Sequence, residues 1–509
     1  MPIIFYGDQI LLVTEVTKLK TFFLDMFYVS IIPKHLHIYI KKLKAKCLKA
    51  LNLLKVIAHT DWGADKKVLL NLYRTFIRSI LDYGCIVYGS ARTSYLKMLD
   101  PIHHQGIRLA LGAFKTSSCE SLLAEANEPP LSHRREMLSA HYALKLRSNT
   151  LNPFFSAVFH PNYKFLYENK PNAIPSFGIR ISSLFDQIKC NLSSIQKTFV
   201  SKTPPWLIKQ PQVIFTLHDR KKSETNPILF LNSYHELLND FTHYAKFYTD
   251  GSKVADKASA AFISGNHITK ERLPNDASIF SAEIRAIDLA LTFIESKHIL
   301  NSIIFCDSLS VLQALHNIKL DNPLLVNILV KNSELSSSYN IVYCWLPSHI
   351  GIRGNEEADR AAKMALSLEP SDFKLPYSDF KPCIKKYLRQ KWQVSWDDAI
   401  NNKLHAIKPN LGEWTPSYRT IRREEVVIAR IRIGHTYMTH SYILKGEDPP
   451  ECVSCNVPFT VKHFMTTCTD LQPTRDKYYN VHDMQELFDT IQITRILDFL
   501  KEVNLYFKL

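Results

Sequence analysis

The feature that most constrains the fold is an alternation of short apolar strands and amphipathic helices between residues 246 and 365. Strands are predicted at 246–253, 260–264, 268–273, 302–306 and 341–346. Helices are predicted at 278–297, 309–317 and 323–336, and another from near residue 355. The first three strands follow one another and should pair antiparallel, whereas the later strands alternate with helices. This order predicts an α/β domain built on a mixed sheet.

Four acidic residues occupy positions that such a sheet would bring to one edge. Asp250 and Asp307 end predicted strands, and Glu283 and Asp359 lie on helices that can face the same edge. An isolated Asp after a strand is usually a turn residue, so only the ordered set carries weight. A cluster of four carboxylates repels itself and raises its own pKa values unless cations neutralise it. Hard oxygen ligands that leave positions open to water suit Mg²⁺ or Mn²⁺, and two such ions can clamp both oxygens of a phosphodiester displacement.

The motifs around these acids resemble those of type 1 ribonuclease H, in the version carried by jockey-like non-LTR retrotransposons. They are YTDGS at 248–252, SAEIRAIDLAL at 281–291, FCDSLSVLQAL at 305–315 and WLPSHIGIRGNEEADRAAKMA at 345–365. The resemblance implies a ribonuclease H-like five-stranded mixed sheet with flanking helices. It also implies an endoribonuclease that hydrolyses the RNA strand of RNA–DNA hybrids with two Mg²⁺ or Mn²⁺ ions.

The resemblance assigns a role to individual residues. Asp250, Glu283, Asp307 and Asp359 match the four metal-binding acids, and His349 matches a loop histidine thought to assist proton transfer and product release. By this likeness Asp250 bridges both ions and Asp359 holds the ion that activates water, so that cleavage leaves a 3′-hydroxyl and a 5′-phosphate. Ser252 and Asn355 fall where the family contacts the hybrid or the edge of its site.

Charge is distributed unevenly along the chain. The whole sequence has a formal net charge of +15, of which residues 1–150 contribute +10, from 21 basic and 11 acidic side chains. Residues 246–366, with 12 basic and 13 acidic side chains, have a net charge of −1. Part of the affinity for a nucleic acid substrate should therefore come from the basic first third of the chain. Its densest stretch is an amphipathic helix pattern with Lys41, Lys42, Lys44, Lys46 and Lys49, although a simple solvated helix face would look the same.

The flanking segments complete a four-part organisation. Residues 1–150 are predicted to be a helical remnant of a reverse-transcriptase thumb and connection, because 41–130 resemble that region of the same elements. Residues 151–240 read as a proline-rich connector whose prolines break helical runs, 241–368 as the ribonuclease H domain, and 369–509 as a helical C-terminal region. The one adjacent aspartate pair, Asp397–Asp398, has a helical pattern, so no polymerase activity is expected. The chain reads as a 3′-terminal fragment of a longer reading frame.

A metal-ligand spacing appears near the end of the chain. Cys452, Cys455, His463 and Cys468 have the spacing C-x2-C-x7-H-x4-C, which can close a tetrahedron around Zn²⁺ in a zinc knuckle at 452–468. The alternative is that they are ordinary small core residues. A set of basic and aromatic residues before them could offer phosphate contacts and stacking surfaces, or form a salt-bridged helix with Glu424 and Glu425. The set comprises Tyr418, Arg419, Arg422, Arg423, Arg430, Arg432, Tyr437 and Tyr442.

Cysteine usage and hydropathy narrow the compartment and the partners. The ten cysteines are too irregularly spaced for a disulfide framework, and neither apolar stretch near the start reads as a signal peptide or a membrane span. An intracellular location, nucleus or cytoplasm, follows, with nucleic acid as the partner, no membrane and no obligate protein partner. The rival to a nuclease is a catalytically idle nucleic-acid-binding protein of transposon origin.

Overall fold

The structure is a computed structural model of the 509-residue chain that describes residues 4–6, 9–11, 33–161, 165, 167, 174–198, 204–219, 224–414 and 421–509. The chain forms two compact units. The first comprises residues 1–140, 161–182 and 385–509, and the second comprises 141–160 and 183–384. Their boundaries fall within the helices α9 (Leu131–Ser148), α12 (Phe177–Ile188) and α18 (Lys381–Asp397).

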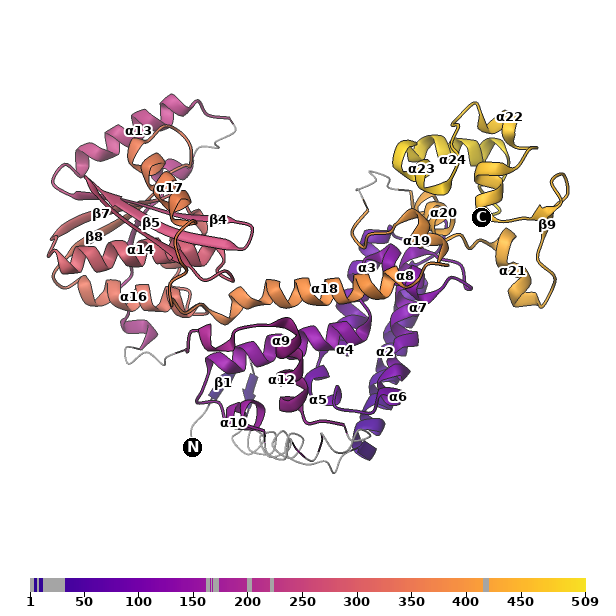
Figure 1. The fold of residues 1–509 in the computed structure, drawn as a ribbon, viewed down its shortest axis with the longest axis horizontal. Coiled ribbons are helices and arrows are strands. Elements are labelled where there is room, and N and C mark those ends of the chain that lie inside the picture. Colours follow the sequence, from indigo (N-terminus) through magenta and orange to yellow (C-terminus); the bar gives the residue numbers. More distant parts are fainter. Residues whose placement is uncertain are drawn as a thin grey trace. The chain divides into compact units, whose positions relative to one another are not determined.

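A mixed sheet of six strands forms the centre of the second unit (Figure 1). The strand order is β3-β8-β7-β4-β5-β6, in which β4, β5 and β6 are antiparallel and β4, β7, β8 and β3 run parallel. The strands are β3 (Gln212–Ile214), β4 (Ala245–Val254), β5 (Lys257–Ser264), β6 (His267–Leu273), β7 (Asn301–Cys306) and β8 (Asn340–Trp345). The mixed sheet and its antiparallel start are confirmed, and Gly265, with φ of 57°, makes the left-handed turn between β5 and β6.

One strand exceeds the five that the sequence predicts. β3 pairs in parallel with β8 at the edge of the sheet. It is three residues long and follows Pro211, so it is too short for an alternating pattern to reveal it. An edge strand tolerates a neighbouring proline because the missing N–H costs no ladder hydrogen bond there.

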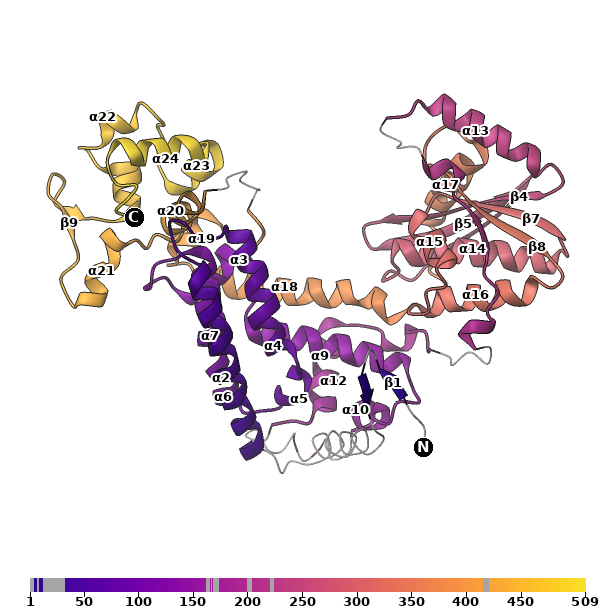
Figure 2. The same cartoon turned by 180° about the vertical axis from the view of Figure 1, so that it is seen from behind.

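Helices cover both faces of the sheet (Figures 1 and 2). One face packs against α14 (Ile279–Ser296), α15 (Leu309–His316) and α16 (Pro323–Leu335), and the other against α13 (Pro227–Asp240) and α17 (Arg353–Ala365). Because side chains alternate along a strand, Ile304 and Cys306 of β7 enter the first core while Ile303 and Phe305 enter the second.

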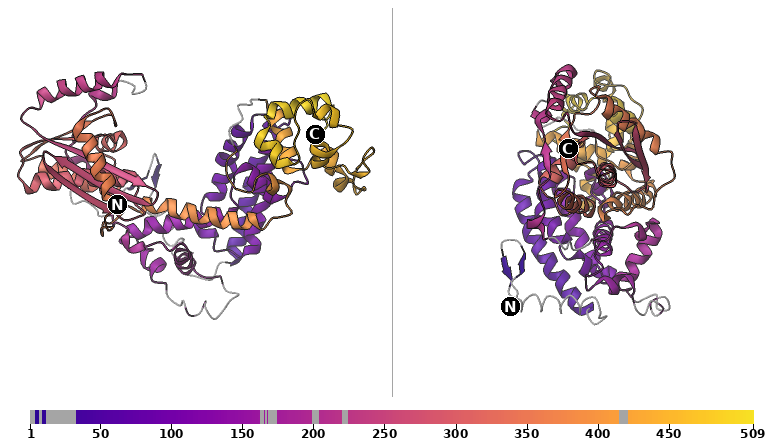
Figure 3. Two further views of the ribbon diagram at one scale, coloured as in Figure 1. Left: turned by 45° about the horizontal axis from the view of Figure 1, so that its top comes forward. Right: turned by 90° about the vertical axis from the view of Figure 1, so that its left-hand side faces the viewer.

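The helix α13 lies in the segment predicted to be a connector with broken helices. Pro227 is its first residue, a position where the missing N–H needs no partner, and the Asn226 side chain caps it by accepting from the Ile228 N–H at 3.0 Å. Phe230 and Tyr234 are buried in the core between α13 and the sheet. The proline therefore starts this helix, and the segment contributes to the second unit (Figure 3).

The first unit is mostly helical. Its longest helix, α2 (Pro33–Ile57), buries Ile40, Cys47 and Leu51, while Lys41, Lys42, Lys46 and Lys49 are exposed. The amphipathic helix predicted there is thus confirmed as local structure. The other helices of this unit include α3 (Lys66–Tyr73), α4 (Ser79–Asp82), α5 (Cys85–Tyr88), α6 (Thr93–Leu96), α7 (Asp100–Leu111), α8 (Cys119–Ala126), α19 (Lys403–Ile407), α20 (Arg422–Ile433), α21 (Tyr437–Lys445), α22 (Gln472–Arg475), α23 (Met484–Thr490) and α24 (Ile493–Glu502).

Two short strand pairs lie outside the six-stranded sheet. β1 (Ile4–Tyr6) pairs with β2 (Gln9–Leu11), and β9 (Glu451–Cys452) pairs with β10 (Val457–Pro458).

Asp397 ends α18, and both it and Asp398 are exposed, as the helical pattern of that segment predicts. Across the described residues, no helix combines the length and the apolar character needed to cross a membrane.

Candidate active site and a candidate zinc centre

The close approach of α14 to β4 creates the centre of the acidic site. Gly251 follows Asp250 in β4, and a Cβ on that glycine would lie 2.7 Å from the backbone nitrogen of Glu283. A glycine is therefore required for α14 to cross β4 at this height. Ser278 caps α14 by accepting from the Ser281 N–H at 3.1 Å, which fixes where the helix starts and so places Glu283 beside Asp250.

Three carboxylates meet at this crossing. Asp250, Glu283 and Asp307, which directly follows β7, each have an oxygen within 4.8 Å of the others. Asp250 and Glu283 are each only 6% exposed, and Asp250 Oδ2 has no hydrogen-bond partner among the described residues. The Cys306 thiol, a neighbour that the sequence did not single out, lies 3.9 Å from Glu283 Oε2.

Burial and mutual repulsion shift the pKa values of all three carboxyl groups. Burial raises the pKa of Asp250 to about 8, and the charges of Asp307 and Asp359 add to the shift. Burial also raises the pKa of Glu283 well above its usual range, with Asp250 and Asp307 as further causes. The pKa of Asp307 is raised by burial, against which a hydrogen bond from Asn355 favours the ionised form. At neutral pH the three carboxyl groups are therefore not all ionised at once in the metal-free protein. Bound divalent cations would neutralise their repulsion and favour the ionised forms.

The fourth predicted acid lies in a neighbouring group. Asp359, on α17, has an oxygen within 4.8 Å of ligand atoms of His349 and Glu356, and it pairs with Lys363 Nζ at 2.7 Å. In this structure Asp359 is not among the three carboxylates that lie within 4.8 Å of one another, and Lys363, one turn along α17, pairs with it. That all four acids hold metal together stays a prediction. The two groups are still neighbours, since the charge of Asp359 raises the pKa of Asp250.

His349 and Glu356 form the outer edge of the second group. The His349 side chain is 63% exposed, and its Nδ1 lies 4.0 Å from Glu356 Oε2. Glu356 is a residue that the sequence reasoning missed, although its place within the acidic run before Asp359 was a usable signal.

The two residues predicted to contact substrate are both buried. Ser252 lies two positions beyond Asp250 in β4, so the two side chains share one face of the strand. Asn355, in the first turn of α17, hydrogen-bonds Asp307, and its Oδ1 is buried without a partner among the described residues. In the structure Asn355 thus contacts a carboxyl group of the site.

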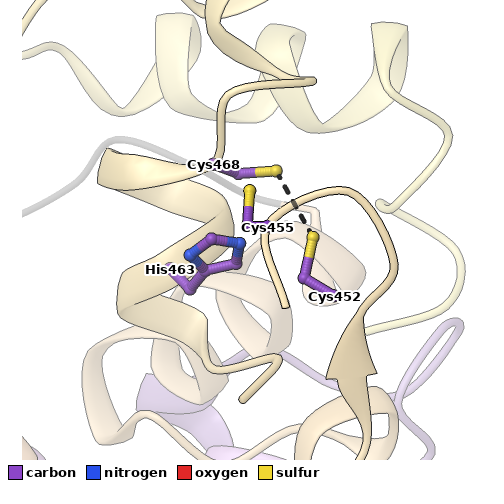
Figure 4. A group of neighbouring side chains, drawn as sticks. All are labelled: Cys452, Cys455, His463 and Cys468. Atoms are coloured by element: carbon purple, nitrogen blue, oxygen red, sulfur yellow. Dashed lines mark hydrogen bonds between the residues drawn. The ribbon is translucent and has the colours of Figure 1, made fainter. Parts of the chain in front are cut away.

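The cysteine and histidine side chains near the C-terminus converge in the first unit (Figure 4). Ligand atoms of Cys452, Cys455, His463 and Cys468 all lie within 4.8 Å of one another. The Cys452 and Cys468 sulfurs are 3.9 Å apart. Two Zn–S bonds of about 2.3 Å at a tetrahedral angle would separate the sulfurs by about 3.8 Å, whereas a disulfide needs about 2.05 Å.

One ring nitrogen of the histidine in this group has no hydrogen-bond partner among the described residues. His463 belongs to a single π-helical turn, His463–Thr467, and its Nδ1 lies 3.1 Å from Thr467 Oγ1. Its Nε2 is buried and has no hydrogen-bond partner in the part of the chain that is described. Burial lowers the pKa of His463, which keeps the imidazole in the neutral form that binds metal. A hydrogen bond with Thr469 lowers the pKa of the Cys455 thiol, which favours its thiolate.

Most of the described arginines before this group hold the first unit together. Arg422 is buried and donates to the carbonyls of Ala110 at 2.7 Å and Leu109 at 3.0 Å. Arg430 donates to the Gly112 carbonyl at 2.8 Å, and the Arg432 guanidinium lies 3.8 Å from the centre of the Trp414 ring. These side chains are committed to packing, which weakens the idea that they contact phosphates. Tyr418 and Arg419 lie outside the described residues.

Comparisons with known proteins bear on one quarter of the chain. Residues 242–367 match the model of the RNase H family. A solved structure, RNase H1 from the halophilic archaeon Halobacterium salinarum NRC-1, aligns with 21% identity and a TM-score of 0.21, covering 24% of this chain and 97% of that one. No curated protein matches the chain. The family match alone supports an RNase H domain at residues 242–367, and at family level it supports a nuclease that acts on RNA–DNA hybrids.

Proposed function

We propose that this protein is a metal-dependent endoribonuclease that hydrolyses the RNA strand of RNA–DNA hybrids. One observation carries the proposal: within the matched domain, the buried carboxyl groups of Asp250 and Glu283 and the half-buried one of Asp307 lie together, all with raised pKa values. Structural carboxyl groups are normally paired with cations of the protein, whereas these three face one another.

Divalent cations fit this group of residues. The buried Asp250 Oδ2 lacks a partner among the described atoms, and oxygen-only ligands suit Mg²⁺ or Mn²⁺. We assign Asp250, Glu283 and Asp307 to hold them, with Asp359 as a further ligand once it leaves Lys363. When bound, such ions lower the pKa of water and stabilise the charge that develops on the phosphate. His349, exposed at the rim, can accept or give a proton at the leaving product. Asn355 fixes the orientation of the Asp307 carboxylate.

The experiment is cleavage of a labelled RNA–DNA duplex by the full chain. We expect cleavage in Mg²⁺ or Mn²⁺, none in Ca²⁺, and none of double-stranded DNA, with 5′-phosphate and 3′-hydroxyl products. Asp250→Asn removes one ligand charge at nearly constant volume, so its fold should persist while cleavage collapses. His349→Ala should slow turnover less, because it leaves the carboxylates in place. Binding without cleavage by the wild type in Mg²⁺ would instead favour an idle nucleic-acid-binding protein.

The basic helix α2 supports a role of the first unit in holding nucleic acid. Its seven lysines include five exposed ones, and residues 33–57 contain no acidic residue. Polyanion binding by such a surface should weaken steeply with salt. The double variant Lys42→Glu, Lys49→Glu should therefore reduce both the affinity for the hybrid and the dependence of that affinity on salt concentration. If the salt dependence does not change, α2 does not bind the hybrid and is only a solvent-exposed helix face.

The four ligands near the C-terminus support a structural Zn²⁺ site. Between Gly446 and Asp470 the chain carries four acidic side chains and one lysine, so we assign this metal a role in folding and not in phosphate binding. The purified chain should contain one zinc per molecule, and Cys455→Ser should lose it together with local order. A zinc-free wild type that keeps its order at 452–468 would make these residues core packing.

The origin of the chain is a further part of the proposal. A thumb-like helical region, an RNase H domain and a Cys/His cluster follow in the order that jockey-like elements would have. Sequencing the surrounding genomic DNA tests this: polymerase motifs upstream and dispersed copies are expected, and a single copy without them would contradict a retrotransposon origin.

A further inference from the structure

Helix α13 lies outside the segment that matches the RNase H family, yet it contacts the strand that carries Asp250. It ends at Asp240, before the matched residues begin at 242. Its Tyr234 is 5% exposed, and the Tyr234 hydroxyl lies 2.5 Å from the hydroxyl of Tyr248, two residues before Asp250 in β4. The two rings also share Phe305, with ring centres 5.6 Å and 5.1 Å away.

Tyr248 in turn determines where α17 begins. The ring packs between the core under α13 and the alanine face of α17. Gly354, in the first turn of α17, lies so close to the Tyr248 ring that a Cβ there would overlap it. The position of this ring therefore fixes the height of the first turn of α17 above the sheet.

That first turn carries residues of the candidate site. Asn355, next to Gly354, hydrogen-bonds Asp307, and Asp359 follows one turn later in the second acidic group. A shift of the Tyr248 ring would move Gly354 and with it both of these side chains. A continuous set of contacts thus runs from Tyr234 through Tyr248 and Gly354 to the acidic site.

We propose that Tyr234 is a positioning residue for the nuclease site, acting through Tyr248 to hold the start of α17, and that the nuclease unit of this chain includes α13. The inference rests on the proposed function for its effect on catalysis, and on geometry alone for its effect on α17. Tyr234 touches neither the carboxylates nor any substrate, so its removal should loosen the site without removing a ligand.

The test compares two substitutions that each delete one buried phenol hydroxyl. Tyr234→Phe removes the hydrogen bond to Tyr248, and the matched control Tyr343→Phe removes a 3.0 Å bond to Asn332 in the core on the opposite face of the sheet. Both should lower the overall stability by similar amounts, because each removes one hydrogen bond made by a buried tyrosine. Hydrogen exchange of the full chain without metal should be faster in α17 for Tyr234→Phe by roughly three- to tenfold, and unchanged there for Tyr343→Phe.

Catalysis gives a second readout. The Mg²⁺ concentration for half-maximal cleavage should rise severalfold for Tyr234→Phe and Tyr248→Phe, and the double variant should show no further rise, because both act on one contact. The inference would be overturned if Tyr234→Phe and Tyr343→Phe changed hydrogen exchange in α17 equally. It would also be overturned if the effects of Tyr234→Phe and Tyr248→Phe on the Mg²⁺ requirement were additive. If the wild type fails to cleave, the proposed function fails, and the exchange measurement alone decides the role of Tyr234.

Discussion

Replacing Asp250 by Asn should stabilise the metal-free protein at alkaline pH and not at acidic pH. Burial, with the charges of Asp307 and Asp359, raises the pKa of Asp250 to about 8 in the folded chain, against about 3.9 for an unfolded Asp. Between these values the unfolded chain has released its proton while the folded chain still holds it. Stability therefore falls as pH rises through this window, and Asn, which does not titrate, escapes the loss.

The size of the effect follows from the same shift. Each pH unit in the window is worth about 1.4 kcal/mol, so about 3 kcal/mol separates pH 5.5 from pH 8. The difference in unfolding free energy between Asp250→Asn and wild type should widen by that amount across this range. Mg²⁺ should narrow the difference again at pH 8, because a bound cation stabilises the ionised wild-type carboxylate.

Hydrogen exchange measured by mass spectrometry can localise this effect. The amides of β4 and β7, which flank the acidic site, report the opening free energy of the sheet at each pH. The amides of α7 in the first unit serve as the internal control and should not differ between the two proteins. A difference that stays constant from pH 5.5 to pH 8 would refute the reasoning, since it would mean that Asp250 is ionised in the folded protein throughout.

Four further predictions follow from single contacts. Gly251→Ala should push α14 away from β4 and abolish hybrid cleavage; near-wild-type rates would contradict the close approach. Lys363→Met should remove a cation from the second acidic group and lower the Mg²⁺ concentration for half-maximal cleavage a few-fold, and a higher requirement would count against that pairing. Glu128→Ala should leave Arg74 and Arg78 without their buried partner and destabilise the first unit by roughly 3 kcal/mol, as measured by hydrogen exchange in α7. A loss of stability under about 1 kcal/mol would show that these two ion pairs are dispensable. The chain should incorporate no dNTP on a primed template, and any templated incorporation would overturn that expectation.

Periodicity in the sequence predicted the sheet and its helices well where the segments are long. The strands of the antiparallel start lie within a few residues of their predicted bounds, because runs rich in apolar and β-branched residues that end at turn residues, such as Gly265, mark strands of this length. The start of α14 was predictable from Ser278, whose hydroxyl caps it. β3 was not predictable, since three residues carry no period. α13 was missed because Pro227 was read as a break, although it is the first residue of the helix, where proline is accepted.

The candidate site was predictable in its residues and only partly in its geometry. Asp250, Glu283 and Asp307 meet because strand ends and the α14 crossing are consequences of the fold that the pattern predicts. The ion pair between Asp359 and Lys363 was not predictable. Their spacing of four residues on α17 allows the pair, but the sequence does not show whether Asp359 contacts Lys363 or the other acids. The contacts of Cys306 with Glu283 and of Tyr234 with Tyr248 depend on packing between elements, which a single sequence does not encode in any local pattern.

The most direct test of the account is the single-turnover rate of RNA cleavage in a labelled RNA–DNA hybrid, measured in Mg²⁺ for the full chain and for Glu283→Gln. This change keeps the side-chain size at the α14 crossing and removes one of the three neighbouring acidic groups. The account predicts that the wild type cuts the RNA strand alone, and that Glu283→Gln binds the hybrid equally well but cuts it at least about 100-fold more slowly. Equal rates for the two proteins, or no cleavage by the wild type, would contradict it.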